Sequence, residues 1–242
     1  MSLWLPDPRW ESGDLMAGRK PRTPVIINPD ISFEKLTGAY LLNWSDKSIA
    51  ENVDLLTNTG DYSPVGVDLS NSGDVIELDM PNLLSGAKDT FTVTCVYRKT
   101  NPYGGSYPRL FESSIGFDLQ SYRDNSDTVL RILNSSVTVN TNIWDGDRHI
   151  FTIAYRKADN SIYDPVKPKF WFYIDGVLEY EDEVRTPDAV FTSGYLRIGN
   201  RSDGKRYNGG GNESIFVHDG VLSAGQVSSL HANIYYKMLI PA

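Results

Sequence analysis

The chain has 242 residues and carries 23 Lys and Arg against 31 Asp and Glu, so its formal net charge at pH 7 is −8. This balance argues against a nucleic-acid partner, because proteins that track phosphates usually present a net basic surface. No run of about 18 apolar residues is present, which argues against a membrane-spanning segment. A single cysteine, Cys95, excludes an internal disulfide framework and a cysteine-based zinc site.

The first forty residues differ in composition from the rest of the chain. Five prolines fall in this segment, and prolines at that density disfavour both helices and interior strands. We therefore predict an extended N-terminal arm over residues 1–40 and one domain over residues 41–242. This arm lies either on a neighbouring subunit or on the chain's own domain, and the sequence does not favour one over the other. The candidate anchoring residues are Trp4, Leu5, Trp10, Arg19, Lys20 and Arg22.

From about Tyr40 onward the sequence alternates between apolar and polar residues with period two, which predicts strands. Short strands separated by Gly and Asp turns are typical of a β-sandwich or jelly roll. The run around Cys95 is one of them, so we expect a small buried side chain there. Asp175-Gly176 suits a tight turn. The predicted strands cover residues 65–69, 75–78, 91–97, 115–119, 137–139, 149–155, 170–174, 195–198 and 215–218.

One helix is predicted, near residues 222–236. Ser223 is a suitable N-cap, because its side chain can accept a hydrogen bond from the first turn. The apolar residues Val227, Leu230 and Ile234 fall on one face at helical spacing. That face predicts packing across the sandwich.

Four segments carry recognisable motifs: residues 144–155 (a Trp, His and Tyr motif), 170–177 (an aromatic strand followed by Asp-Gly), 195–200 and 213–230. Read in this order, they resemble the laminin G-like branch of the concanavalin A-like lectin and glucanase superfamily. The resemblance implies an all-β, concanavalin A-like jelly-roll sandwich with one short C-terminal helix. Within these motifs we expect His149 to satisfy a backbone group beside its strand.

A second resemblance concerns phage proteins. Residues 40–48, with Trp44, Asp46 and Ser48, are similar to a motif in many phage and prophage proteins of this fold. The last residues are similar to the tail of the same proteins, except that Ile234-Tyr235 replaces Pro-Trp. This implies a non-enzymatic virion protein of a tailed phage, either a capsid decoration or a tail component. The implied partners are other virion proteins, with homo-oligomers expected.

The superfamily also includes glycoside hydrolases, which need two carboxyl groups about 5–5.5 Å apart for retaining hydrolysis. In its glucanase branch these groups come from one strand with the pattern E-x-D-x-E. Here only residues 179–183 are similar, and the middle residue is Glu181. We interpret this run as an acidic strand edge that prevents unwanted pairing. The prediction is therefore that the chain is not an enzyme, with a glycoside hydrolase kept as the third hypothesis.

The second hypothesis is a carbohydrate-binding module for host adsorption, whose partner would be a cell-surface glycan. Sugar sites combine an aromatic ring face with a few polar groups. In residues 170–173 one strand face fills the core, which places Trp171 and Tyr173 on the opposite face. That face is either a bare sugar-binding surface or one covered by the arm or another subunit. The candidate carbohydrate-binding residues are Trp171, Tyr173, Tyr122, Arg123, Tyr103 and Tyr107.

No cofactor and no metal ligand are predicted. Calcium is the cofactor that the resemblance suggests, and oxygen ligands are plentiful in residues 124–127 and 145–147. Neither run has the spacing of an EF-hand loop, and solvated turns explain both.

Overall fold

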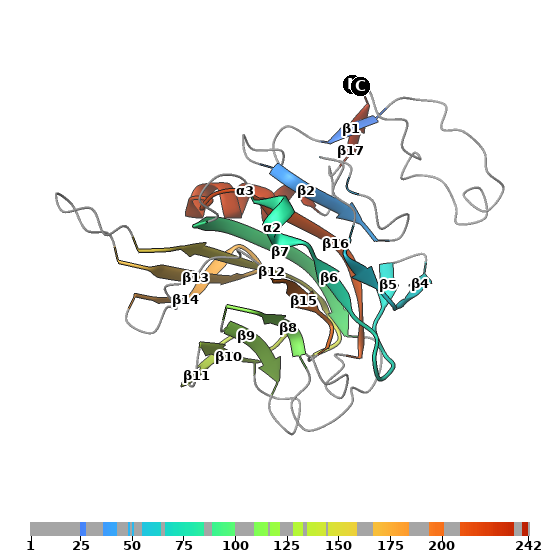
Figure 1. Ribbon diagram of the computed structural model, residues 1–242, viewed down its shortest axis with the longest axis horizontal. Helices are drawn as coiled ribbons and strands as arrows, with labels where there is room; N and C mark the ends of the chain where they lie inside the picture. Colours follow the sequence, from blue (N-terminus) through green and yellow to red (C-terminus); the bar gives the residue numbers. More distant parts are fainter. Residues whose placement is uncertain are drawn as a thin grey trace.

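The computed structural model describes residues 25–27, 36–42, 48, 50, 55–63, 66–84, 89–99, 109–115, 117–121, 128–132, 135–143, 145–158, 167–183, 194–200, 209–234 and 239–241. These residues form a pair of large antiparallel sheets that pack face to face (Figure 1). The predicted all-β sandwich is confirmed.

The first sheet has eight strands. Strand β7 (Thr90–Lys99) lies near its middle, between β12 (Arg148–Arg156) and β16 (Gly210–His218). On its other side β16 pairs with two short strands, one before and one after a bulge between Asn212 and Ser214. In order the sheet runs β14 (Val177–Asp182), β13 (Lys169–Ile174), β12, β7, β16, β5 (Gly66–Asp68) and β4 (Asp61–Ser63), with β2 (Leu36–Leu41) beside β16.

The second sheet has seven strands and forms the other layer of the sandwich. In order it runs β11 (Ser135–Val139), β10 (Thr128–Ile132), β9 (Phe117–Ser121), β8 (Arg109–Ser113), β15 (Leu196–Ile198), β6 (Ile76–Leu78) and β3 (Thr57–Asn58). A separate pair joins β1 (Val25–Ile27) to β17 (Leu239–Pro241). A short helix, α2 (Met80–Leu83), follows β6.

The main core lies between the two sheets. Phe111 of β8 stacks on Phe151 of β12, with ring centroids 5.8 Å apart, so the two layers meet through aromatic side chains. Cys95 is fully buried in this core, as predicted. Burial of large apolar side chains on both inner faces is the principal stabilising term of such a sandwich.

Helix α3 (Ala224–Ile234) closes the outer face of the eight-stranded sheet. The predicted face, Val227, Leu230 and Ile234, is buried in a second apolar cluster that includes Val96 and Tyr173. At its start the Gln226 backbone N–H donates to Ser223 Oγ (3.3 Å) and the Ser223 N–H donates to Gln226 Oε1 (2.9 Å). This reciprocal capping box explains why the helix begins at this point.

Three features differ from the sequence prediction. Residues 36–40 belong to β2 and pair with β16, so the sandwich begins within the segment predicted as an arm. Val25–Ile27 pairs with Leu239–Pro241. These three residues are β-branched and none is a proline, so each has the backbone N–H that a strand pair needs, although prolines lie on both sides of the run. Helix α2 was not predicted; the Asp79 side chain caps it, and Pro81 occupies its first turn.

Candidate binding surface

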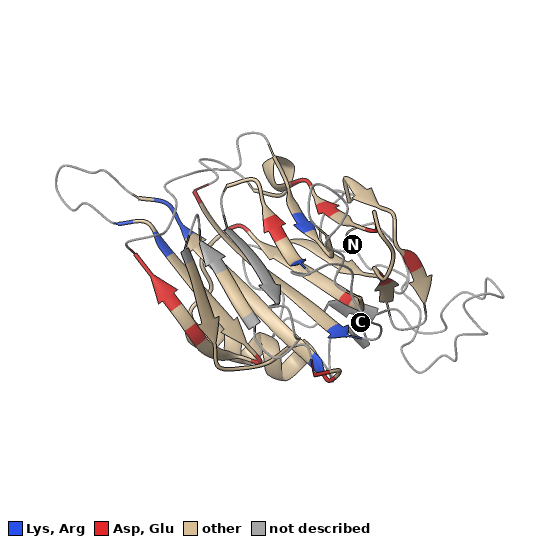
Figure 2. Cartoon of the chain, turned by 90° about the horizontal axis from the view of Figure 1, so that it is seen from below, with Lys and Arg blue, Asp and Glu red and all other residues tan. Residues whose placement is uncertain are grey.

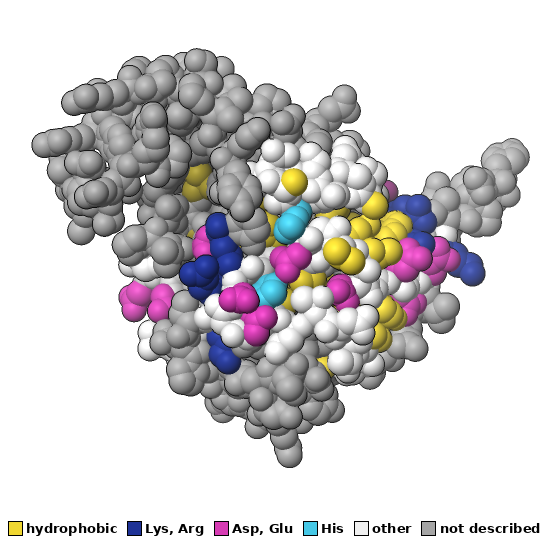
Figure 3. All heavy atoms as spheres, turned by 180° about the vertical axis from the view of Figure 1, so that it is seen from behind, with side chains coloured by type: hydrophobic (Ala, Val, Ile, Leu, Met, Phe, Trp, Pro, Cys, Tyr) yellow, Lys and Arg dark blue, Asp and Glu magenta, His cyan; other side chains and the backbone are white. Residues whose placement is uncertain are grey.

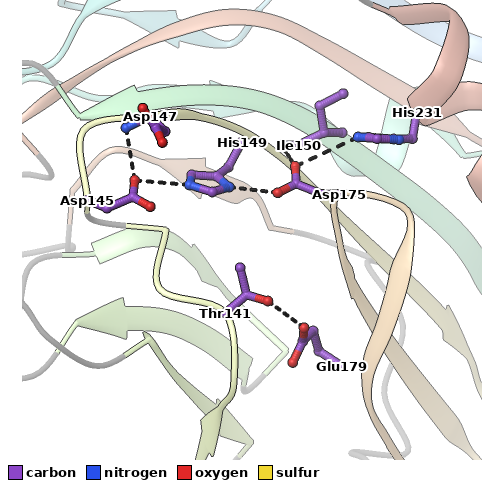
Figure 4. Close-up of polar contacts among 8 residues, drawn as sticks. All are labelled: Thr141, Asp145, Asp147, His149, Ile150, Asp175, Glu179 and His231. Atoms are coloured by element: carbon purple, nitrogen blue, oxygen red, sulfur yellow. Dashed lines mark hydrogen bonds and ion pairs between the residues drawn. The ribbon is translucent and has the colours of Figure 1, made fainter.

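His149 lies at the beginning of β12 between two carboxylates (Figure 4). Its Nδ1 is 2.7 Å from Asp175 Oδ2, and its Nε2 is 3.0 Å from Asp145 Oδ1. Since both ring nitrogens face carboxylate oxygens, the arrangement favours an imidazolium that donates at both positions. The expected contact with a backbone group is therefore wrong, because the loop and turn bring carboxylates to both nitrogens.

The pKa values of this cluster shift in opposite directions. The hydrogen bond to Asp175 raises the pKa of His149, burial opposes that shift, and Asp145 adds to it. Burial alone would raise the pKa of Asp175, but the hydrogen bonds from His149 and from the Ile150 backbone N–H lower it overall. Both shifts favour the ionised form of the pair.

The Asp175-Gly176 turn between β13 and β14 is held from several sides. Both residues have positive φ, 51° and 79°, as the predicted tight turn requires. Asp175 Oδ1 accepts the Ile150 N–H at 2.9 Å, and His231 of α3 lies 3.9 Å from the same oxygen. A Cβ on Gly176 would be 3.2 Å from the His231 side chain, so a larger residue here would need a small shift of His231 as well as a strained positive φ.

Beyond the turn, Val177 and Leu178 are exposed on β14, at 62% and 44%. Glu179 turns toward the segment before β12, where it accepts hydrogen bonds from Thr141 Oγ1 (2.6 Å) and the Asn140 N–H (3.1 Å). Figure 4 shows this contact below the histidine cluster. The hairpin is therefore fixed to β12, to the segment before it and to α3.

Trp171 lies on the outer face of β13 and is partly exposed. One side packs against the α3 cluster, while Arg156 and Lys169 lie over the ring, 5.6 and 5.3 Å from its centroid. Lys169 Nζ is 3.0 Å from Glu181 and 3.4 Å from Glu183. We call this set, Arg156, Lys169, Trp171, Glu181 and Glu183, the Trp171 surface.

The surroundings of the Trp171 surface are rich in charge. Figure 2 shows acidic residues along the edge strand of the eight-stranded sheet and basic residues beside them. Figure 3 shows apolar side chains next to acidic and basic ones on the same side of the molecule. The Glu181 carboxylate holds the pKa of Lys169 above its usual value, with Glu183 adding to the effect.

Tyr173 does not share this exposure. It is 5% exposed and packs under α3, so its ring is not available to a sugar in this structure. Sequence alternation placed it correctly on the outer face but gave no sign that the helix covers that position.

The acidic run 179–183 forms most of the edge strand β14, as predicted. Its carboxylates are divided among different partners: Glu179 contacts Thr141, Glu181 contacts Lys169, and Asp182 accepts from Tyr180. A bulge opposite Phe172 and Tyr173 disturbs the regular alternation. Glu181 and Glu183 share Lys169, whereas Glu179 contacts Thr141, so the three glutamates are not grouped together.

A third charged group was missed by the sequence reasoning. Arg197 on β15 pairs with Glu77 of β6 and lies 3.5 Å from Glu112 of β8, while its guanidinium lies 4.3 Å from the Tyr195 ring centroid. Strand register brings these residues together from distant positions in the sequence. Their side chains are only 14–19% exposed, which favours a structural role.

Several predicted residues lie outside the described residues. They include every candidate arm residue (Trp4, Leu5, Trp10, Arg19, Lys20 and Arg22) and the candidates Tyr103, Tyr107, Tyr122 and Arg123. Trp144 and residues 124–127 also lie outside them. Asp145, from the other suggested calcium run, contacts His149 instead. Among the residues that the structure describes, no three His, Cys, Asp or Glu side chains are grouped to hold a metal ion, and no helix is long and apolar enough to span a membrane.

No family model matches the chain, and no curated protein matches it. Several solved structures are similar to it in fold. A Trypanosoma rangeli sialidase in complex with a difluorinated ketodeoxynononic acid matches 97% of this chain and 37% of its own, with a TM-score of 0.64 at 13% identity. The binding domain of Paraclostridial Mosquitocidal Protein 1 matches 84% of this chain and 53% of its own, with a TM-score of 0.55 at 16% identity.

A mutant of HCR/D matches 77% of this chain and 47% of its own, with a TM-score of 0.53 at 13% identity. The chain thus spans between about a third and a half of these structures. At these identities the likeness establishes a lectin-like sandwich fold. The prediction that the chain is not an enzyme is contradicted by these sialidase structures, which match 85–97% of this chain, while the chain spans 34–37% of theirs.

Proposed function

We propose that this chain is a lectin-like binding module that recognises a glycan through the Trp171 surface. The observation that carries the proposal is the partly exposed Trp171 ring, surrounded by charged side chains that can bond to hydroxyl groups. An aromatic platform with a few polar neighbours is the usual composition of a sugar site. One of the similar structures is a binding domain, and another is a sialidase in complex with sialic acid, which supports the choice of ligand class.

The test is binding to a panel of bacterial polysaccharides by the full chain and three variants. Trp171→Ala removes the ring, and Trp171→Leu keeps apolar packing against α3 while removing the aromatic face. Tyr62→Ala is the matched control, because Tyr62 is 51% exposed on β4 at the other edge of the sheet. We expect both Trp171 variants to bind at least about tenfold more weakly, equivalent to about 1.4 kcal/mol, and Tyr62→Ala to bind normally.

Thermal unfolding of each variant separates recognition from folding. Trp171→Leu should retain a midpoint within a few degrees of the wild-type chain. Absence of polysaccharide binding by the wild-type chain, or unchanged binding by Trp171→Leu, contradicts the proposal.

We further propose that the module acts in the virion of a tailed phage, attached to other virion proteins and presenting the sandwich to host glycans. Support comes from the two motif resemblances at residues 40–48 and near the C-terminus. The test is copy number in gradient-purified particles by quantitative mass spectrometry. A count comparable to the major capsid protein supports a decoration protein, and a count comparable to tail proteins supports an adsorption component. Absence from particles contradicts this setting.

A further inference from the structure

The Trp171 surface continues along the edge strand toward the tight turn. On the outer face of the sheet Trp171 is the register partner of Glu181 of β14, and Tyr173 is the register partner of Leu178. Leu178 is 44% exposed, although Tyr173 beside it is covered by α3. The accessible part of this face is therefore a strip along β14, with Leu178 at one end and the Trp171 surface at the other. We call it the β14 strip.

A bulge places Leu178 on this face. The register between β13 and β14 shifts once, so that Glu179 is an extra residue in the ladder. Leu178 is three residues from Glu181, and without the bulge it would alternate to the opposite face. Val177 does lie on the opposite face, because its register partner Ile174 belongs to the main core.

The β14 strip is too long for one sugar ring. On β13 it extends from Lys169 to Tyr173, four residues further, which corresponds to about 13 Å along the strand. A pyranose ring covers one aromatic ring face, so a monosaccharide on Trp171 leaves Leu178 uncovered. A linear oligosaccharide that runs parallel to β14 covers both.

The most exposed charges of the β14 strip are carboxylates. The side chains of Glu181 and Glu183 are 49% and 41% exposed, whereas Lys169, which contacts both, is 19% exposed. Carboxylate oxygens only accept hydrogen bonds, and sugar hydroxyl groups donate them. An acidic sugar would instead bring a like charge to these two groups, on a chain whose net charge is already −8.

The two cations of the strip are engaged within the protein. Arg156 lies over the Trp171 ring, and its Nη2 donates to the Lys167 carbonyl oxygen at 3.3 Å. Lys169 lies over the same ring and contacts the two carboxylates. The four charged groups of the Trp171 surface thus balance without a charged ligand.

The β14 strip is also held in place before a ligand binds. The turn at its beginning is fixed by the contact between His149 and Asp175 at 2.7 Å, and Glu179 accepts the hydroxyl of Thr141 at 2.6 Å (Figure 4). Lys169 joins β13 to the far end of β14. A surface ordered in advance loses less conformational entropy on binding.

We propose that the β14 strip binds an uncharged, linear oligosaccharide that lies along β14 and contacts Leu178 as well as Trp171. This inference rests on the proposed glycan-binding function and adds the length and the charge of the glycan. Leu178 contacts the apolar C–H face of one sugar unit. Glu181 and Glu183 accept hydrogen bonds from the hydroxyl groups of the units beside Trp171.

The experiment is isothermal titration calorimetry on the full chain with three uncharged linear hexasaccharides: cellohexaose, maltohexaose and chitohexaose. The corresponding monosaccharides test length, and a linear hexamer of galacturonic acid tests charge. We expect at least one uncharged hexasaccharide to bind, and its monosaccharide to bind at least about tenfold more weakly because it makes only one of the two contacts. The galacturonic acid hexamer should not bind.

Two variants test the contact at the far end of the strip. Leu178→Ser should weaken binding of the hexasaccharide at least about fivefold, because an apolar side chain no longer becomes buried. Val177→Ser is the matched control, since Val177 is the neighbouring apolar side chain, is 62% exposed and lies on the opposite face. It should leave hexasaccharide affinity unchanged, and thermal unfolding of both variants verifies that they fold.

The outcomes distinguish this inference from the proposed function. Trp171-dependent binding of a polysaccharide without binding of any uncharged hexasaccharide overturns the inference alone. Equal or tighter binding of the galacturonic acid hexamer, or an unchanged affinity in Leu178→Ser, also overturns it. Absence of binding to every polysaccharide and oligosaccharide contradicts the proposed function itself.

Discussion

The Asp145–His149–Asp175 cluster makes a pH-dependent contribution to stability that Asp175→Asn should remove. Asparagine keeps an oxygen for the Ile150 N–H and tolerates the positive φ of this turn position. It removes the charged partner of His149. A hydrogen bond between charged groups contributes about 1.5–3 kcal/mol, and we take the lower end because the Asp175 side chain is 33% exposed. The expected loss is about 1.5 kcal/mol, or about 3–6 °C for a domain of this size.

The direction of the pH dependence follows from the two shifts. The pKa of His149 is raised in the folded state, so its contribution is complete below the unfolded pKa of about 6.5 and is lost as pH rises through the folded pKa. The pKa of Asp175 is lowered, so its contribution is complete above the unfolded pKa of about 3.9 and is lost as pH falls through the folded pKa. Asp175→Asn should therefore destabilise most between about pH 4 and 6.5.

Urea unfolding at pH 5.5, 7 and 9, followed by tryptophan fluorescence, measures this difference. Other charged groups face the cluster: Asp147, whose backbone N–H donates to Asp145 at 2.8 Å, and His231, 3.9 Å from Asp175. Asp147→Asn is the matched control, since it removes a nearby exposed carboxylate that does not contact the imidazole. A difference between wild type and Asp175→Asn that is the same at pH 5.5 and pH 9 would refute the reasoning.

Two further predictions concern the fold. Ser223→Ala removes the helix cap and should lower stability by about 1 kcal/mol, whereas Ser228→Ala, an exposed position of the same helix, should have little effect in the same urea titration. Burial raises the pKa of the Cys95 thiol well above its ordinary value, and the charge of Glu213 adds to this, so the native thiol should resist alkylation at pH 8. Labelling measured by mass spectrometry should increase only under unfolding conditions, and rapid labelling of the native chain would contradict the assigned burial.

Local pattern was sufficient for the elements whose side chains alternate regularly. The strand around Cys95 and the strand containing Phe170 both formed where predicted, because period-two alternation corresponds directly to the two faces of a strand. The capped helix formed for a similar reason, since Ser223 and the spacing of Val227, Leu230 and Ile234 act within one short segment.

Contacts between distant segments were not predictable in the same way. His149 and Asp175 are 26 residues apart, and their contact depends on the pairing of β12 with β13 and on the tight turn. Tyr173 illustrates the same limit, because whether the outer face is bare depends on a helix about 50 residues later. Strands β8 and β10 were missed for a related reason: such short strands are stabilised by neighbours in the sheet rather than by their own pattern.

The position of α3 explains why the middle of this sheet face is buried while Trp171 at one end and Arg98 at the other stay accessible. The helix covers Tyr173 and the pair formed by Val96 and Ile150, which occupy the middle of the face. Trp171 lies two residues from Tyr173 toward one end, and Arg148 lies two residues from Ile150 toward the other. Because both ends belong to the same rigid ladder, their separation of about 20 Å is fixed by strand geometry.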